Sequence, residues 1–190
     1  MPADQRADRV AAVVAHVDAG EPRCGTTRLV AVDGPSGAGK TTLAREVADV
    51  LGAPTVHMDD LYPGWDGLRE GVQLARQWVV DPLRAGRPAR YRRWDWVHDR
   101  FAEWVQVPAG EVLVLEGCGS GVLPVGAHAT TLVWVDADPR VRRARGLARD
   151  PGYAAFWDRW ARQEQELYAA DGTAARAHLS VDTTGDGLEP

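Results

Sequence analysis

Residues 34–42 read Gly-Pro-Ser-Gly-Ala-Gly-Lys-Thr-Thr and place three glycines directly before a lysine and two threonines. The segment satisfies the pattern G-x-x-x-x-G-K-[ST], which is typical of loops that bind polyphosphates. Backbone N–H groups can converge on phosphate oxygens only where side chains do not block the approach, which explains the small residues. We therefore expect nucleotide phosphates to be bound by Gly34, Pro35, Ser36, Gly37, Ala38, Gly39, Lys40, Thr41 and Thr42.

Two side chains of this loop carry specific chemistry. Lys40 is expected to add a positive charge toward the β- and γ-phosphates, and the Thr41 hydroxyl is placed to hold Mg²⁺. The helix that follows points its positive end at the same oxygens. The sequence contains no N-K-x-D segment, with which guanine-nucleotide switch proteins usually read the base. ATP and Mg²⁺ are therefore the predicted cofactors.

Acidic residues follow two of the expected strands. Asp59 and Asp60 end the strand expected at 54–60, and Tyr62 follows two residues later. Glu116 lies near the end of the apolar run at 111–117. Ligands of a parallel sheet gather at the carboxyl ends of its strands. Phosphoryl transfer needs a group there that orients or deprotonates the attacking hydroxyl, so these acids are candidate catalytic residues. A turn or a helix cap is the alternative role for the two aspartates.

The stretches DGPSGAGKTTLA, MDDLYPGW and VLVLEG together resemble the uridine kinase and phosphoribulokinase group of P-loop kinases. The resemblance implies that Asp59 is the catalytic base and that Thr41, Glu116 and Asp59 lie around Mg²⁺. Leu61 stands where the group usually has phenylalanine. Asp60 replaces a small polar residue, so the choice between the two aspartates stays open.

An aromatic and basic segment, RYRRWDWVHDR, precedes the strand at 111–117. The resemblance implies a role in holding the acceptor, because uridine kinases have an aromatic-acid-aromatic stretch here, followed by a histidine. The match is loose, which leaves the acceptor's identity open, and a hydrophobic clasp over the core is the alternative. The predicted acceptor-binding residues are Asp60, Tyr62, Tyr91, Trp94, Asp95 and His98.

The arginine-rich helix expected at 139–150 is the start of a short lid, about residues 139–155. Kinases of the resembling group use lid arginines to neutralise charge on the transferred phosphoryl group. Arg142, Arg145 and Arg149 share one helical face. We expect Arg145 and Arg149 to be catalytic, with a solvated basic face as the alternative for most arginines of the run.

Apolar stretches alternate between strand-like and helical periods along the chain. Short β-branched runs predict strands at 28–33, 54–60, 111–117, 130–138 and 177–183. Helices are expected at 3–18, 40–52, 139–150 and 153–170, and over 66–86 until Pro82. This alternation predicts a three-layer α/β P-loop NTPase fold, with a parallel five-stranded sheet flanked by helices. We expect one domain over residues 1–190, with an N-terminal helix within 1–20.

Composition sets limits on the partners. The 190 residues are 45% hydrophobic and carry a net charge of −5, which predicts no basic face for nucleic acid. No apolar run of membrane-spanning length occurs, so no membrane partner is expected. The first twenty residues do not resemble a signal peptide. Cys24 and Cys118 form no disulfide framework or metal motif, so a cytoplasmic location is the expectation.

These observations together predict an ATP-dependent kinase that transfers the γ-phosphoryl group to a hydroxyl of a small-molecule acceptor. A nucleoside or nucleoside-like acceptor is expected from the resemblance. A nucleotide, a sugar acid or a vitamin precursor is the alternative acceptor. A different class of function is an ATP-binding regulatory module with slow hydrolysis. Assembly into a homo-oligomer is left open.

Overall fold

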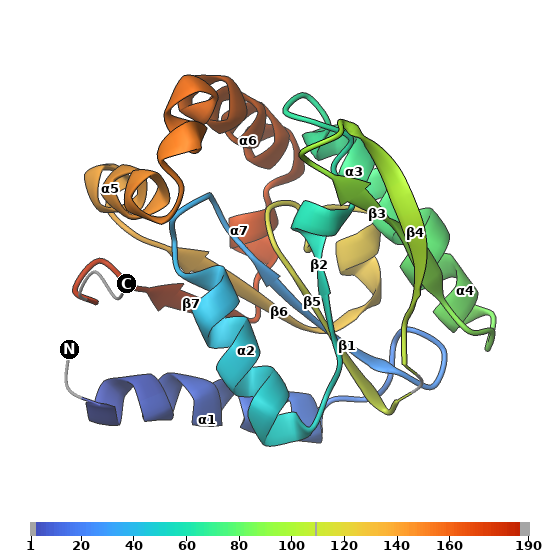
Figure 1. The fold of residues 1–190 in the computed structure, drawn as a ribbon. Coiled ribbons are helices and arrows are strands. Elements are labelled where there is room, and N and C mark those ends of the chain that lie inside the picture. The colour runs from blue at the N-terminus through green and yellow to red at the C-terminus, as the bar shows by residue number, and fades with distance from the viewer. Residues whose placement is uncertain (1–2, 109, 187–190) are drawn as a thin grey trace.

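Five parallel strands form the central sheet of the computed structural model, which describes residues 3–108 and 110–186. The spatial order is β2-β5-β1-β6-β7, so β1 lies in the middle. Figure 1 shows helices on both faces of this sheet. The predicted three-layer α/β fold is therefore confirmed. The strands are β1 (Arg28–Asp33), β2 (Thr55–His57), β5 (Val112–Glu116), β6 (Ala129–Asp136) and β7 (Leu179–Asp182).

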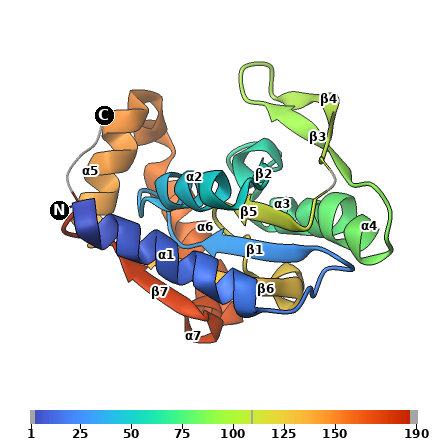
Figure 2. The same cartoon turned by 90° about the horizontal axis from the view of Figure 1, so that it is seen from below.

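Seven α-helices surround the sheet in the described part of the chain, and a β-hairpin stands beside it (Figure 2). The hairpin consists of β3 (Arg90–Asp95) and β4 (Arg100–Gln106). The helices are α1 (Ala3–Ala19), α2 (Lys40–Leu51), α3 (Leu68–Ala75), α4 (Asp81–Arg84), α5 (Pro139–Arg149), α6 (Trp157–Asp171) and α7 (Thr173–Arg176).

The alternation of side chains along β1 builds a core on each face of the sheet. Val30 and Val32 point toward α1 and α2, where they pack against Val13 and Val47. Leu29 points to the opposite face, which is covered by side chains from α3 and α6. Strands buried on both faces read as continuous apolar runs. This burial holds the carboxyl ends of β1, β2 and β5 at one fixed edge.

Three elements differ from the prediction. The strand expected at 54–60 ends at His57, and Met58–Asp60 form a 3-10 turn. The helix expected to end near Pro82 continues to Arg84 through a π-helical turn, Arg76–Val80. Proline is tolerated there because it lies in the first turn of α4. Residues 87–107, to which no element was assigned, contain the whole hairpin.

Among residues 3–108 and 110–186, no helix combines the length and the apolar character that crossing a bilayer requires.

Candidate active site

The loop between β1 and α2 is held in a conformation that depends on glycine. Gly34 has φ 141°, and a Cβ atom there would lie 1.9 Å from the Val135 carbonyl oxygen. Gly37 has φ 76°, and its Cβ would lie 2.1 Å from the Arg142 carbonyl oxygen. Both values lie in the region that favours glycine. The small residues are therefore required by the packing of the loop as well as by its expected ligand.

The amides of this loop fit an anionic polyphosphate. Within the described residues, the N–H groups of Gly37 and Gly39 donate to no acceptor. The first amides of α2, which begins at Lys40, have no partner inside the helix and point toward the same loop. Unpaired amides at a helix N-terminus, with a glycine at each approach, are the donor set that phosphate oxygens need. The predicted nucleotide phosphates would be held here.

Lys40 is the only lysine in the sequence, and its side chain is buried. Its Nζ atom donates to the Pro35 carbonyl at 3.0 Å and lies 3.4 Å from the Cys118 Sγ atom. Burial by itself lowers the pKa of Lys40, but the surrounding Cys118, Glu164 and Glu116 side chains outweigh burial and raise it. The ammonium group is therefore charged and positioned inside the loop, as expected for a ligand of the β- and γ-phosphates.

The predicted magnesium ligands Thr41 and Glu116 lie together. The Thr41 hydroxyl lies 3.3 and 3.2 Å from the Glu116 Oε1 and Oε2 atoms, and the His57 Nδ1 atom lies 2.6 Å from the same Oε1 atom. This hydrogen bond to Glu116 raises the pKa of His57. Residues 3–108 and 110–186 hold no group of three His, Cys, Asp or Glu side chains suited to a metal. One hydroxyl and one carboxylate fit Mg²⁺, which keeps most of its water and binds through substrate phosphates.

Asp59 lies in the 3-10 turn that follows β2, at the carboxyl edge of the sheet. Its side chain is exposed to solvent, although protein surrounds it, and its carboxylate accepts no hydrogen bond from any described residue. Partial desolvation raises the pKa of Asp59, and the nearby Glu116 carboxylate raises it further. Lys40 and Arg149 oppose these effects. An accessible carboxylate with a raised pKa has the properties of a general base.

The neighbouring Asp60 is already engaged, because its carboxylate accepts a hydrogen bond from the Tyr91 hydroxyl at 3.0 Å. Tyr91 is 5% exposed and Tyr62 is 1% exposed, and the Tyr62 hydroxyl donates to the Cys118 carbonyl at 2.7 Å. The predicted contacts of these two tyrosines with an acceptor are therefore not available in this arrangement. Their rings are buried in the core, next to the acidic turn Met58–Asp60.

The tip of the hairpin has a mixed role. Trp94 is 9% exposed and packs edge-on against Phe101, so it belongs to the core and not to the surface around Asp59. The Asp95 carboxylate accepts the backbone N–H of His98 and bonds its ring nitrogen at 2.8 Å, which stabilises the turn. Asp95 and His98 were expected to contact the acceptor, and in the structure they are hydrogen-bonded to each other.

Trp96, at the tip of the hairpin, lies beside Asp59. It is 39% exposed, and its indole N–H donates to the Asp59 carbonyl at 3.0 Å. Trp96 also lies 4.9 Å from the ring of Trp65, which stacks on Tyr153 and Phe156. This aromatic wall joins the hairpin tip to the segment between α5 and α6, directly beside the candidate base.

The two predicted lid arginines have different surroundings. Arg145 donates to the Thr183 hydroxyl and to the carbonyls of Thr183 and Asp186, at 2.5–2.9 Å. Thr183 in turn donates to the Ala38 carbonyl of the P-loop at 2.8 Å. Arg145 is therefore occupied with the segment after β7 and does not point a free guanidinium at the loop. The Arg149 side chain is exposed and makes no hydrogen bond to another described residue, and its charge acts on Asp59.

Sequence reasoning missed Asp33, the last residue of β1. Its buried carboxylate accepts the amides of Gly34, Gly119 and Gly121 at 2.6–2.8 Å and the Tyr168 hydroxyl at 2.7 Å. Burial raises its pKa, and these hydrogen bonds partly offset that effect. Asp33 thereby ties the P-loop to the loop after β5. The signal in the sequence was a charged residue at the end of a fully apolar strand.

Replacing Asp33 with alanine is expected to destabilise the fold more than any exposed substitution. The buried N–H groups of Gly34 and Gly121 would lose their acceptor, at a cost of about 1–3 kcal/mol each when left unsatisfied, whereas the Gly119 N–H would keep the Tyr168 hydroxyl. We expect the free energy of unfolding in urea to fall by about 3 kcal/mol or more. Asp49→Ala, at an exposed position of α2, is the control. A loss of less than about 1 kcal/mol would contradict the role of Asp33 as an anchor.

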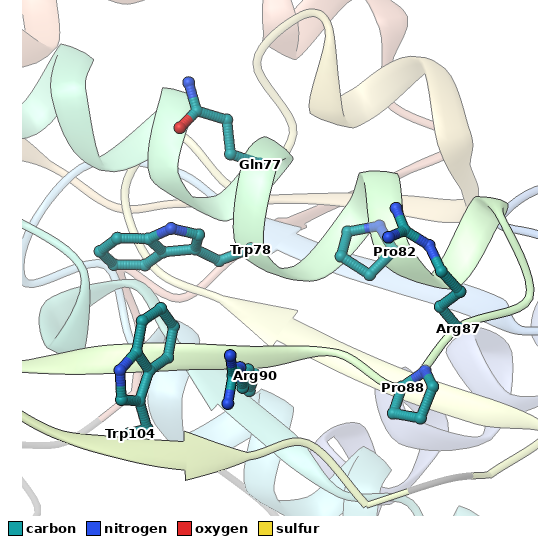
Figure 3. A pocket seen from close by; sticks show the side chains of 7 residues that line it. All are labelled: Gln77, Trp78, Pro82, Arg87, Pro88, Arg90 and Trp104. Atoms are coloured by element: carbon teal, nitrogen blue, oxygen red, sulfur yellow. The ribbon is translucent and has the colours of Figure 1, made fainter.

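A separate pocket lies between the hairpin and α4, and Figure 3 shows its lining. It has a volume of about 200 Å³ and is lined in part by Trp78, Arg90 and Trp104. Arg90 lies 4.7 Å from the centre of the Trp104 ring, as in a cation–π contact. None of the predicted site residues line this pocket, so it is distinct from the candidate site around Asp59 and the P-loop.

Comparisons with known proteins agree with this geometry. A family model described as an AAA domain matches residues 30–155, which contain the P-loop and both acidic strand ends. A possible uridine kinase from Bacillus stearothermophilus is 18% identical, with a TM-score of 0.68 over 94% of this chain and 100% of that chain. A candidate fructose transport system kinase from Silicibacter sp. TM1040 is 20% identical, with a TM-score of 0.56 over 90% of this chain and 98% of that chain. No curated protein matches. The shared fold confirms the resemblance to P-loop kinases that the sequence motifs indicated.

Proposed function

Because the chain belongs to the AAA domain family and has the fold of uridine kinase-like proteins, we propose that it is an ATP-dependent small-molecule kinase. It would transfer the γ-phosphoryl group of ATP to a hydroxyl of a nucleoside or nucleoside-like acceptor. One observation carries the proposal: the free carboxylate of Asp59 lies in the turn that directly follows β2, which ends beside Glu116 of β5, and Glu116 in turn accepts the Thr41 hydroxyl of the P-loop. A phosphate-binding loop is thereby joined to a base that a nucleotide-binding module alone does not require.

In this proposal, each residue at the edge of the sheet has a separate task. The amides of Gly37 and Gly39 bind phosphate oxygens, and the Lys40 ammonium neutralises the charge on the β- and γ-phosphates. Thr41 and Glu116 would hold Mg²⁺, which supplies charge neutralisation when it is bound. Arg149 is the lid arginine available to the phosphoryl group, since Arg145 is occupied. The Lys40 ammonium and the Glu116 carboxylate are held in place before reaction, and such preorganised charge is the main source of catalysis in phosphoryl transfer.

Asp59 is the proposed base, because its carboxylate is open to solvent while that of Asp60 is bonded to Tyr91. An acceptor hydroxyl placed above Asp59 would give up its proton to this carboxylate as it attacks. Trp96 and Trp65 provide an aromatic surface beside Asp59, on which a planar acceptor such as a nucleobase can stack.

The arginines of the hairpin bear on the alternative of a phosphorylated acceptor. Arg92 donates to the carbonyls of Ala102 and Phe101, and Arg93 pairs with Glu103. Arg90 stacks on Trp104, in the separate pocket between the hairpin and α4. Since all three have partners within the hairpin, a neutral alcohol is favoured over a nucleotide acceptor. Sugar acids and vitamin precursors remain the alternative within the kinase proposal.

Acceptor-stimulated release of ADP tests the proposal. We expect one of a panel of nucleosides and sugars to raise ADP production from Mg-ATP well above the rate with ATP alone. The measurement is a coupled ADP assay, with the corresponding deoxy compound as control for the hydroxyl that reacts. Binding of ATP with an ADP rate that no acceptor raises would instead indicate a regulatory module with slow hydrolysis.

A further inference from the structure

Three residues from the lid side of the molecule converge on Ser36, the third residue of the P-loop. The Tyr153 hydroxyl donates to the Ser36 Oγ atom at 3.0 Å, and an Arg142 nitrogen lies 3.5 Å from the Ser36 carbonyl. Glu164, from the middle of α6, makes the strongest contact. Figure 1 shows α5 and α6 beside the loop that precedes α2. The lid region is therefore packed directly on the loop.

One oxygen of the Glu164 carboxylate accepts three hydrogen bonds. Glu164 is 4% exposed, and its Oε1 atom accepts the Ser36 N–H at 2.9 Å and the Ser36 hydroxyl at 2.6 Å. The Cys118 thiol donates to the same oxygen at 3.1 Å. A backbone amide and a hydroxyl at the mouth of a phosphate loop are donors that would also suit a phosphate oxygen. In this structure, a side chain of the protein itself takes them.

Glu164 also lies on the side of the loop that Lys40 serves. The Cys118 Sγ atom is 3.4 Å from the Lys40 Nζ atom and 3.1 Å from the Glu164 carboxylate, so it bridges the two charged groups. In phosphate loops the lysine reaches the β- and γ-phosphates, whereas the amides nearer the helix cradle the α- and β-phosphates. The position of Glu164 therefore corresponds to the terminal-phosphate side of the loop.

We propose that the Glu164 side chain competes with the γ-phosphate of ATP for the donors of Ser36, at the terminal-phosphate side of the P-loop. The inference rests on the proposed binding of ATP. ATP brings a γ-phosphate to this position and must displace the carboxylate from Ser36 and from the Cys118 thiol that lies beside Lys40. ADP has no γ-phosphate and leaves the carboxylate in place. Glu164 then sets the balance between ATP and ADP affinity, and its displacement releases α6 from the loop.

The test compares dissociation constants for Mg-ATP and Mg-ADP by calorimetry, without an acceptor. Glu164→Gln keeps the size and the acceptor oxygen of the side chain but removes its charge. We expect the dissociation constant for ATP to fall about tenfold and that for ADP to change less than about twofold, because only the γ-phosphate competes with the lost charge. Glu166→Gln, at an exposed position of the same helix, is the matched control and should change neither constant.

Several outcomes would overturn the inference. An unchanged ATP constant in Glu164→Gln, or a weakening of ATP and ADP by the same factor, would show that Glu164 only supports the fold. Failure of the wild-type chain to bind either nucleotide would overturn the proposed function as well. If Glu164→Gln does not fold, Ser36→Ala removes the hydroxyl donor at 2.6 Å and should raise the ratio of ADP to ATP constants in the same direction. A ratio unchanged by Ser36→Ala would also count against the inference.

Discussion

Replacing Lys40 with alanine is expected to abolish productive binding of Mg-ATP while the chain still folds. The side chain supplies the one ammonium group inside the loop, and it is buried and charged. Losing a preorganised charge at a phosphoryl group typically costs about 10²–10³-fold in turnover, and we expect kcat/KM for ATP to fall by at least this factor. Nucleotide binding and steady-state kinetics measure the effect.

Folding of the Lys40→Ala variant needs its own measurement, because the lysine also balances nearby carboxylates. Removing it takes one of two donors from the Pro35 carbonyl, which keeps the Ala38 N–H, and removes a cation near Glu164. The midpoint of thermal unfolding should therefore fall, with a transition that remains cooperative. Arg45→Ala removes an exposed cation from the same helix and is the control. Wild-type kinetics in Lys40→Ala would exclude this loop as the ATP site.

Replacing Asp59 with asparagine is expected to keep ATP affinity and remove turnover. Asparagine has nearly the same shape but cannot accept the proton of the acceptor hydroxyl. General base catalysis contributes about 10²–10⁴-fold, so kcat should fall within this range while the ATP dissociation constant stays nearly constant. Asp60→Asn is the matched control, since its carboxylate is bonded to Tyr91. A larger loss of kcat in Asp60→Asn would exchange the roles of the two aspartates.

The same carboxylate sets the expected pH dependence. Asp59 must be ionised to act as a base, so kcat/KM falls as the pH drops through its pKa. Burial and Glu116 raise that pKa, so the acid limb should lie above the value of about 3.9 found for an ordinary aspartate. The limb should be absent from the residual activity of Asp59→Asn. A limb at or below the ordinary value would indicate that Asp59 is not desolvated in the free enzyme.

The parts of the site that depend on local sequence were predictable. The P-loop follows from the spacing of Gly34, Gly39 and Lys40, because strand, turn and helix are adjacent in the chain. The sheet follows from β-branched runs that must be buried on both faces. The position of Glu116 beside Thr41 follows from the rule that strand ends share one edge.

The parts that depend on tertiary packing were not predictable from the motifs. Tyr62 and Trp94 resemble stacking residues in sequence, but burial places them in the core. Glu164 is one polar residue in an amphipathic helix, and only the packing of α6 on the loop shows its contact with Ser36. The hairpin was missed because arginines interrupt its alternation, and its turn depends on Asp99 at φ 51°.

The position of the single lysine has a consequence for chemical labelling of this chain. Apart from the amino terminus, a reagent that acylates amines has only Lys40 to attack, and the raised pKa and burial of that group keep it protonated and shielded. Acylation of Lys40 in the folded chain would then proceed only as fast as the P-loop opens. The rate at which Lys40 itself is acylated, counted separately from the amino terminus, would report the opening of the P-loop without any engineered probe.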